Sequence, residues 1–142
     1  MSVQAVLLPV FVLVALTFAL QVWMAFARVG ELQAGRVKVR DIALGERNWP
    51  PRVLQIANAF HNQLELPLLF YVLTILALFT RQADFLFVVL AWLFVLSRLV
   101  HAFIHVTNNR LRLRFYAYAF GALVLMLMWA IFAIRILTAP VP

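Results

Sequence analysis

The side chains best suited to chemistry are basic and aromatic groups that recur at helical spacing in the second half of the chain. They are separated by three, four, five, four and four positions and comprise Arg98, His101, His105, Arg110, Arg114 and Tyr118. The first three would form one stripe on a helix, and the last three would share a face of the next helix if it begins early enough. Three arginines and two histidines in one region are suited to hold an anion through charge-assisted hydrogen bonds.

Polar groups also interrupt an earlier apolar run. The stretch Ala59–Phe70 reads AFHNQLELPLLF and carries His61, Asn62 and Glu65 before Pro67. A carboxylate within a membrane span is costly and usually faces a protein interior or a cavity. Because proline removes one backbone hydrogen bond from a helix, we expect a kink just beyond Glu65.

The composition indicates an integral membrane protein. Of the 142 residues, 66% are hydrophobic, and the mean hydropathy is +1.00. A soluble domain of this size could not bury that many apolar side chains. Four stretches reach the roughly 20 residues that a helix needs to cross a bilayer, at about 5–27, 53–80, 84–106 and 115–138. The sequence therefore predicts an all-α fold, a bundle of four transmembrane helices that forms a single domain over residues 1–142.

The positive charge is concentrated in two of the three connections. The net charge is +7, and most of the lysines and arginines lie between the first and second runs or between the third and fourth. This distribution predicts that those two connections are cytoplasmic and that both termini lie on the non-cytoplasmic side. We expect location in a bacterial inner membrane. No nucleic-acid partner is expected, because topology accounts for the basic residues and no basic groove interleaved with aromatics accompanies them.

With this topology, three segments bring their polar residues to one membrane depth. Glu65 lies in the cytoplasmic half of the second span, Arg98 and His101 in the last turns of the third, and Arg114 and Tyr118 in the first turns of the fourth. Isolated interhelical hydrogen bonds, each contributing about 0.6–2 kcal/mol, would not need to share a depth. The convergence favours a site, in which the simplest pairing joins Glu65 to Arg98 or His101.

A metal or haem site is the alternative interpretation of the histidines. His101 and His105 are four positions apart, and His61 and Glu65 repeat that spacing, so two such pairs could supply four ligands. The neighbouring arginines would repel a cation. We therefore expect no metal.

These residues resemble the MAPEG family, the membrane-associated proteins in eicosanoid and glutathione metabolism, which include microsomal glutathione transferases and the membrane-bound prostaglandin E synthase. The family's second helix carries an Arg-Ala-His-x-Asn-x-x-Glu type signature and then an apolar run with proline, similar to Asn62–Glu65 and Leu66–Phe70 here. The prostaglandin synthase branch has Arg, His, an aromatic, Arg, Arg and Tyr at increments of 3, 4, 5, 4 and 4. The set that begins at Arg98 has the same increments, with His105 in place of the aromatic residue.

The resemblance implies a homotrimer that binds glutathione between subunits near the cytoplasmic face. It implies that Arg98 and Arg110 bind the glutathione carboxylates and that Glu65 helps to hold the ammonium end. Arg114 has the position of the thiolate-stabilising arginine, and Tyr118 lies one turn deeper as a hydrogen-bond donor. The remaining residues expected around glutathione are His61, Asn62, His101 and His105. A lipophilic electrophile would enter from the bilayer lipids in a transferase or peroxidase reaction.

Two positions depart from the family signature. Asn58 stands where the family has arginine, and Phe60 where it has histidine. Loss of one charge-assisted contact would weaken glutathione binding by about 1.5–3 kcal/mol, although His61 adjoins the gap. Whether the chain is an enzyme therefore stays open. The alternative is a non-catalytic member of the family that serves as a lipid-binding module or as an accessory subunit of a larger membrane complex.

Overall fold

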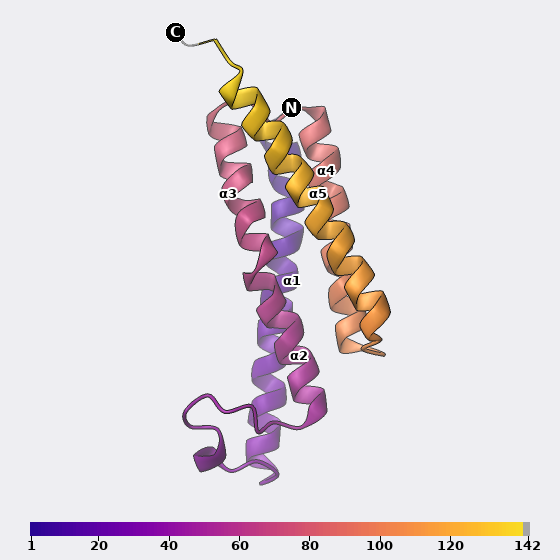
Figure 1. Ribbon diagram of the computed structural model, residues 1–142. Coiled ribbons are helices and arrows are strands. Elements are labelled where there is room, and N and C mark those ends of the chain that lie inside the picture. Colours follow the sequence, from indigo (N-terminus) through magenta and orange to yellow (C-terminus); the bar gives the residue numbers. More distant parts are fainter. Residues whose placement is uncertain (141–142) are drawn as a thin grey trace.

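The computed structural model describes residues 1–140, which form a bundle of long α-helices (Figure 1). The helices and the two short 3₁₀ segments are α1 (Val3–Gln33), η1 (Val39–Asp41), α2 (Pro51–His61), η2 (Asn62–Leu64), α3 (Leu66–Phe79), α4 (Phe85–Val106) and α5 (Leu111–Leu137). Four units are long and apolar enough to cross a membrane: α1, the α2–α3 pair, α4 and α5. Both ends of the described chain lie at the same end of the bundle, as an even number of crossings requires.

The observed helices are longer than the predicted spans at their polar ends. The first continues through Gln33 instead of ending near residue 27, and the last begins at Leu111 instead of near residue 115. A hydropathy run measures only the apolar part of a helix, so it misses turns that project beyond the hydrocarbon. The early start of α5 makes Arg110 its N-cap and puts Arg114 and Tyr118 one turn apart on a helix.

The second span is broken in the middle. α2 begins at Pro51, directly after its N-cap Pro50, and ends at His61; η2 follows, and α3 begins at Leu66. Pro67 lies in the first turn of α3, where a missing N–H costs nothing. The expected disturbance near Glu65 is therefore an interruption of the helix, in which η2 joins two α-helical halves.

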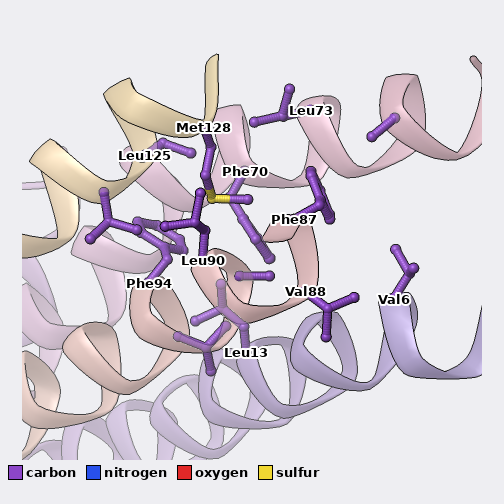
Figure 2. Packing of buried hydrophobic residues seen from close by; sticks show 14 residues of the cluster. Val6, Leu13, Phe70, Leu73, Phe87, Val88, Leu90, Phe94, Leu125 and Met128 are labelled. Atoms are coloured by element: carbon purple, nitrogen blue, oxygen red, sulfur yellow. The ribbon is translucent and has the colours of Figure 1, made fainter. Parts of the chain in front are cut away.

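The apolar core (Figure 2) is formed by residues of α1, α3, α4 and α5. These residues belong to the half of each helix nearer the end of the bundle at which both termini lie (Figure 1). The largest buried side chains of the core are Leu13 of α1, Phe70 and Leu73 of α3, Phe87, Leu90 and Phe94 of α4, and Leu125 and Met128 of α5. The Phe70 and Phe94 rings are 4.9 Å apart. α4 is the most buried of the four spans, so it is the element around which the others pack.

A close approach between α4 and α5 depends on one glycine. A Cβ atom at Gly121 would lie 2.3 Å from the Ser97 hydroxyl oxygen and 3.4 Å from Ser97 Cβ. The hydroxyl donates to the Phe94 carbonyl at 2.6 Å, which holds it in place. Glycine at 121 therefore sets how closely the two helices approach, at a level just nearer the termini than the polar residues that α4 and α5 share.

Candidate functional site

A polar pocket of about 300 Å³ lies where the α4–α5 connection meets the break between α2 and α3. It is lined by Asn62, Glu65, His101, His105, Leu111, Arg114, Phe115 and Tyr118. Its size is at the lower end of the roughly 300–1,000 Å³ found for small-molecule sites. Six of the eight lining residues are polar groups that the sequence analysis named as site candidates. Leu111 and Phe115 were not predicted as site residues. They are four positions apart and adjoin Arg114 and Tyr118, so helical spacing could have placed them on the same face of α5.

The helix break positions the two polar residues of the second span. The Asn62 amide donates to the Asn58 carbonyl at 2.8 Å, and its nitrogen is 3.2 Å from His105 Nε2. An amide nitrogen carries two donors, so His105 Nε2 is the acceptor in the second contact. Glu65, with φ −96° and ψ −105°, is the turn residue between η2 and α3 and lies exposed at the pocket rim.

The α4 stripe forms the inner wall of the pocket. Arg98 is fully buried, and its Nη2 lies 3.1 Å from His101 Nδ1. Because a guanidinium only donates, His101 Nδ1 accepts, which puts the proton of the neutral ring on Nε2. The Arg98 guanidinium also stacks 5.4 Å from the Tyr118 ring, and the His101 ring centroid is 5.1 Å from that of His105. Arg98 therefore lies behind the wall and contacts two of the residues that form it.

The first turns of α5 supply the opposite wall. Arg114 is half-buried, and its Nη1 donates to the side-chain oxygen of Asn109 in the α4–α5 connection. Asn109 has φ +51°, a left-handed conformation that asparagine tolerates better than most residues. The Tyr118 ring lies 5.8 Å from the His101 ring. A tight connection thus fixes the arginine beside the histidines.

The predicted pairing of Glu65 with Arg98 or His101 is wrong. The ion pairs within residues 1–140 lie elsewhere and join Glu31 to Arg36, Asp41 to Arg40 and Asp84 to Arg135. Glu65 is exposed on the rim, whereas Arg98 is sealed between α4 and α5. The positive charge around the pocket is therefore not matched by a carboxylate in contact, and Nε and Nη1 of Arg98 have no hydrogen-bond partner among the described atoms.

Three predicted site residues do not line this pocket. Arg98 lies behind it, as described above. Arg110 is the exposed N-cap of α5. His61 is exposed and faces a separate hollow beside the first loop. It precedes Asn62 by one position, and adjacent helical residues point about 100° apart.

The four-ligand metal site considered from the sequence does not form. Its His61–Glu65 pair is divided between two pockets, because His61 faces the hollow beside the first loop and Glu65 lies on the rim of the polar pocket. Within residues 1–140 there is no group of three or more His, Asp or Glu side chains placed to hold a metal ion. His101 and His105 instead bond to Arg98 and Asn62, respectively.

A loop arginine contacts the position where the family signature is altered. Arg47, in the segment before α2, donates to the side-chain oxygen of Asn58. The two residues are 11 positions apart, and no spacing rule predicts a contact across an irregular loop. The structure thus brings a guanidinium to the side chain of residue 58, although residue 58 is itself neutral.

Comparison with known proteins assigns the fold to a family. The sequence profile described as the MAPEG family matches residues 6–134, nearly the whole chain. The chain belongs to the MAPEG family. Together with four apolar helices of spanning length, this membership makes it an integral membrane protein. The family includes glutathione transferases and related membrane proteins. Neither a curated protein nor a solved structure matches the chain significantly.

Proposed function

We propose that this MAPEG protein is a membrane-embedded, glutathione-dependent transferase or peroxidase-like protein that acts on lipophilic electrophiles. One observation carries the proposal: Arg114 and Tyr118 of α5 line the same pocket as Asn62, His101 and His105. A cation and a hydroxyl donor on one side, with polar groups on the other, suit an anionic peptide that carries a thiol.

The charges around the pocket favour an anion of the kind that glutathione provides. Glutathione has two carboxylates and one ammonium group. Arg110, exposed at the start of α5, is available to a carboxylate, and Glu65 on the rim is available to the ammonium. Arg98 is buried behind His101 and Tyr118. In this proposal it orients those two side chains and adds positive potential without touching the ligand.

Arg114 would stabilise the reactive form of the thiol. The thiolate is the nucleophile, and a neighbouring cation lowers the pKa of a thiol. The thiol proton leaves to solvent at the pocket mouth. The sulfur then forms a bond to the electrophilic atom while the bond from that atom to its leaving group breaks. Tyr118 would donate a hydrogen bond to the sulfur before the attack.

An apolar groove offers the lipophilic partner a path from the bilayer. A hollow of about 480 Å³ runs between α3 and α5 and is lined by Leu66, Leu69, Ala122, Leu125, Met126 and Trp129. Leu66 follows Glu65, and Ala122 lies one turn beyond Tyr118. The groove therefore begins beside the polar pocket, so a molecule with an apolar chain could occupy the groove while its reactive end reaches Arg114.

Glutathione binding tests the proposal directly. Isothermal titration of the detergent-purified protein should show binding that Arg114→Ala weakens and Arg112→Ala leaves unchanged. Arg112 is the matched control, because it is an exposed arginine two positions away on the same helix and does not line the pocket. No heat of binding at millimolar glutathione, which corresponds to a free energy weaker than about −4 kcal/mol, would rule out this function.

We further propose that the protein is a homotrimer in a bacterial inner membrane, with the pocket end of the bundle in the cytoplasm. The positive charge of the first and third connections supports this orientation. Large apolar side chains cover the outward faces of α1 and α5 and suit contact with membrane lipids or with neighbouring subunits. Native mass spectrometry from detergent would test the trimer, and protease accessibility of the first loop in sealed vesicles would test the orientation.

A second candidate is a non-catalytic MAPEG protein that binds lipid or serves as an accessory subunit of a larger membrane complex. The observation in its favour is Asn58, a neutral residue whose side-chain oxygen is already used by Arg47. This candidate predicts co-purification with a partner complex and no change in any property on addition of glutathione.

A further inference from the structure

A second polar pocket lies on the other side of α2. It has a volume of about 280 Å³ and is enclosed by the end of α1, the first loop and α2. Its lining residues are Arg28, Ile42, Gly45, Glu46, Arg47, Trp49, Leu54, Ala57 and His61. None of these residues lines the pocket that contains Arg114, so this hollow, termed the loop pocket below, is a separate feature.

The loop pocket carries more positive than negative charge. Arg28 and Arg47 line it, with Glu46 as the one carboxylate among its lining residues. The Glu46 carboxylate accepts from the Leu44 backbone N–H at 2.9 Å, and it is in no ion pair within residues 1–140. The nearby Glu31 is held by two hydrogen bonds from Arg36, at 2.6 and 2.9 Å. Both pocket arginines therefore lack a carboxylate in contact.

The two guanidinium groups have donors to spare. Arg28 stacks on the Trp49 ring at 5.1 Å from its centroid, which orients the guanidinium without using its N–H groups. Its Nε is buried and has no hydrogen-bond partner in the part of the chain that the structure describes. Arg47 donates through Nη2 to Asn58, a neutral acceptor. The Nη groups of Arg28 and the remaining N–H groups of Arg47 would be free to donate to an oxyanion that entered the pocket.

The depth of the loop pocket matches the headgroup layer of a membrane. Arg28 lies 25 positions after Val3, the first residue of α1, which is about 38 Å along a helix that rises 1.5 Å per residue. The hydrocarbon core of a bilayer is only about 30 Å thick. Trp49 beside it is of the type that favours the membrane–water interface. Ile42, Leu54 and Ala57 add an apolar wall to the lining of the pocket, from the first loop and α2.

We propose that the loop pocket binds the phosphate group of an anionic phospholipid from the adjacent leaflet. Arg28 and Arg47 would donate to the phosphate oxygens, while the apolar wall contacts the glycerol and the first methylenes of the acyl chains. Depth and the apolar wall favour a lipid phosphate over a free one, which would gain nothing from either feature. The site is independent of the Arg114 pocket and does not depend on glutathione binding.

The test measures lipid binding to the purified full-length protein by native mass spectrometry in detergent. Phosphatidylglycerol is the probe, and phosphatidylcholine, which has the same phosphate but no net charge, is the reference lipid. Arg28→Gln and Arg47→Gln should each raise the dissociation constant for phosphatidylglycerol about tenfold or more. Arg40→Gln is the matched control, because it removes one charge from the same loop at an exposed residue that does not line the pocket.

The possible results separate clearly. Weakened phosphatidylglycerol binding in the two pocket variants, with the control unchanged, supports the site. Equal weakening in all three variants would mean general attraction to a positive loop and would overturn it. Equal binding of the two lipids would also overturn it. If inorganic phosphate alone binds in the pocket as tightly as the lipid does, the ligand is a free phosphate and the lipid assignment fails. Because Arg47 is exposed in a loop, its variant remains informative even if Arg28→Gln disturbs the Trp49 stack.

Discussion

Replacement of Arg114 by alanine should remove the group that would hold glutathione as its thiolate. The guanidinium is half-buried in the pocket wall and donates a hydrogen bond to Asn109, which holds it beside the pocket. An opposite charge within about 4–6 Å commonly shifts a pKa by 1–3 units. A middle value of about 2 units would bring an ordinary thiol pKa of about 8.5 to about 6.5.

The size of the expected change follows from these values. At pH 7, about three quarters of a thiol with pKa 6.5 is ionised, against about 3% of one with pKa 8.5. Arg114→Ala should therefore lower the thiolate fraction of bound glutathione about 25-fold at pH 7. At pH 9 both forms are mostly ionised, and the difference should shrink to less than twofold. Arg114→Lys keeps a cation and should fall between the two.

The assay is a pH titration of the ultraviolet absorbance of the thiolate in the protein–glutathione complex, with S-methylglutathione as the blank because it has no thiol. The titration midpoint should move up by about 2 units in Arg114→Ala and stay in place in Arg112→Ala. Turnover of an electrophile at neutral pH should fall in the first variant only. A midpoint that does not move would refute the role of Arg114 even if turnover fell, because the residue would then position a substrate without stabilising the thiolate.

Three further outcomes are expected from residues that shape the bundle. Gly121→Ala should destabilise the protein by about 1–3 kcal/mol, because the new methyl group meets the Ser97 hydroxyl at 2.3 Å; thermal unfolding in detergent measures this. The Asp84–Arg135 ion pair, at 2.7 Å, holds the pKa of Asp84 below its ordinary value of 3.8. It should therefore stabilise the fold at neutral pH by at most about 1 kcal/mol and lose this effect as the pH falls below that value, so the melting-temperature difference between wild type and Asp84→Asn should vanish in acid. Pro67→Ala supplies the missing N–H and should draw η2 toward regular helix, which weakens glutathione binding while the melting temperature is unchanged or higher.

Each of these outcomes has its own control. Ser97→Ala in the Gly121→Ala background removes the clashing oxygen and should restore most of the lost stability; no recovery would mean that the backbone, not the hydroxyl, limits the approach. In Asp84→Asn the side-chain oxygen still accepts from the N–H of Phe87, so the N-cap of α4 is preserved. If the melting temperatures of wild type and Asp84→Asn still differ in acid, the effect comes from the cap and not from the ion pair. A Pro67→Ala variant that binds glutathione as well as wild type would show that the proline is not needed to shape the pocket.

The sequence predicted the bundle well because its strongest signals are local. Long apolar runs identify the four spans, and Pro50–Pro51 marks the start of α2. The proline at 67 located the break in the second span. The predicted helix ends were less accurate. The first turn of α5 has the composition of a basic loop, yet it is helical from Leu111. The length of an apolar run identifies the part of a helix that lies in the hydrocarbon core, and it gives no information about the polar turns beyond that core.

The sequence predicted which site residues lie at the same membrane depth, but it did not predict which of them are in contact. Membrane depth depends only on position along a helix, so Glu65, His101 and Arg114 were expected together and line one pocket. Contacts depend on how each helix is rotated about its axis, which a single sequence does not encode. This is why Glu65 was paired with a buried arginine that it does not reach, and why His61 faces the other side of α2.

The division of the bundle into an apolar half and a polar half explains how the pocket can exist. Near the termini, four helices bury a continuous apolar cluster, and this half supplies most of the stabilisation from burial. At the other end, Nε and Nη1 of Arg98 and Nδ1 of His105 are buried without partners. Each such donor costs about 1–3 kcal/mol while unpaired. In the proposed function, the fully buried Arg98 guanidinium lies behind the polar pocket and adds positive potential that would favour an anion there. Burial of apolar side chains in the other half of the bundle offsets the cost of these unpaired groups.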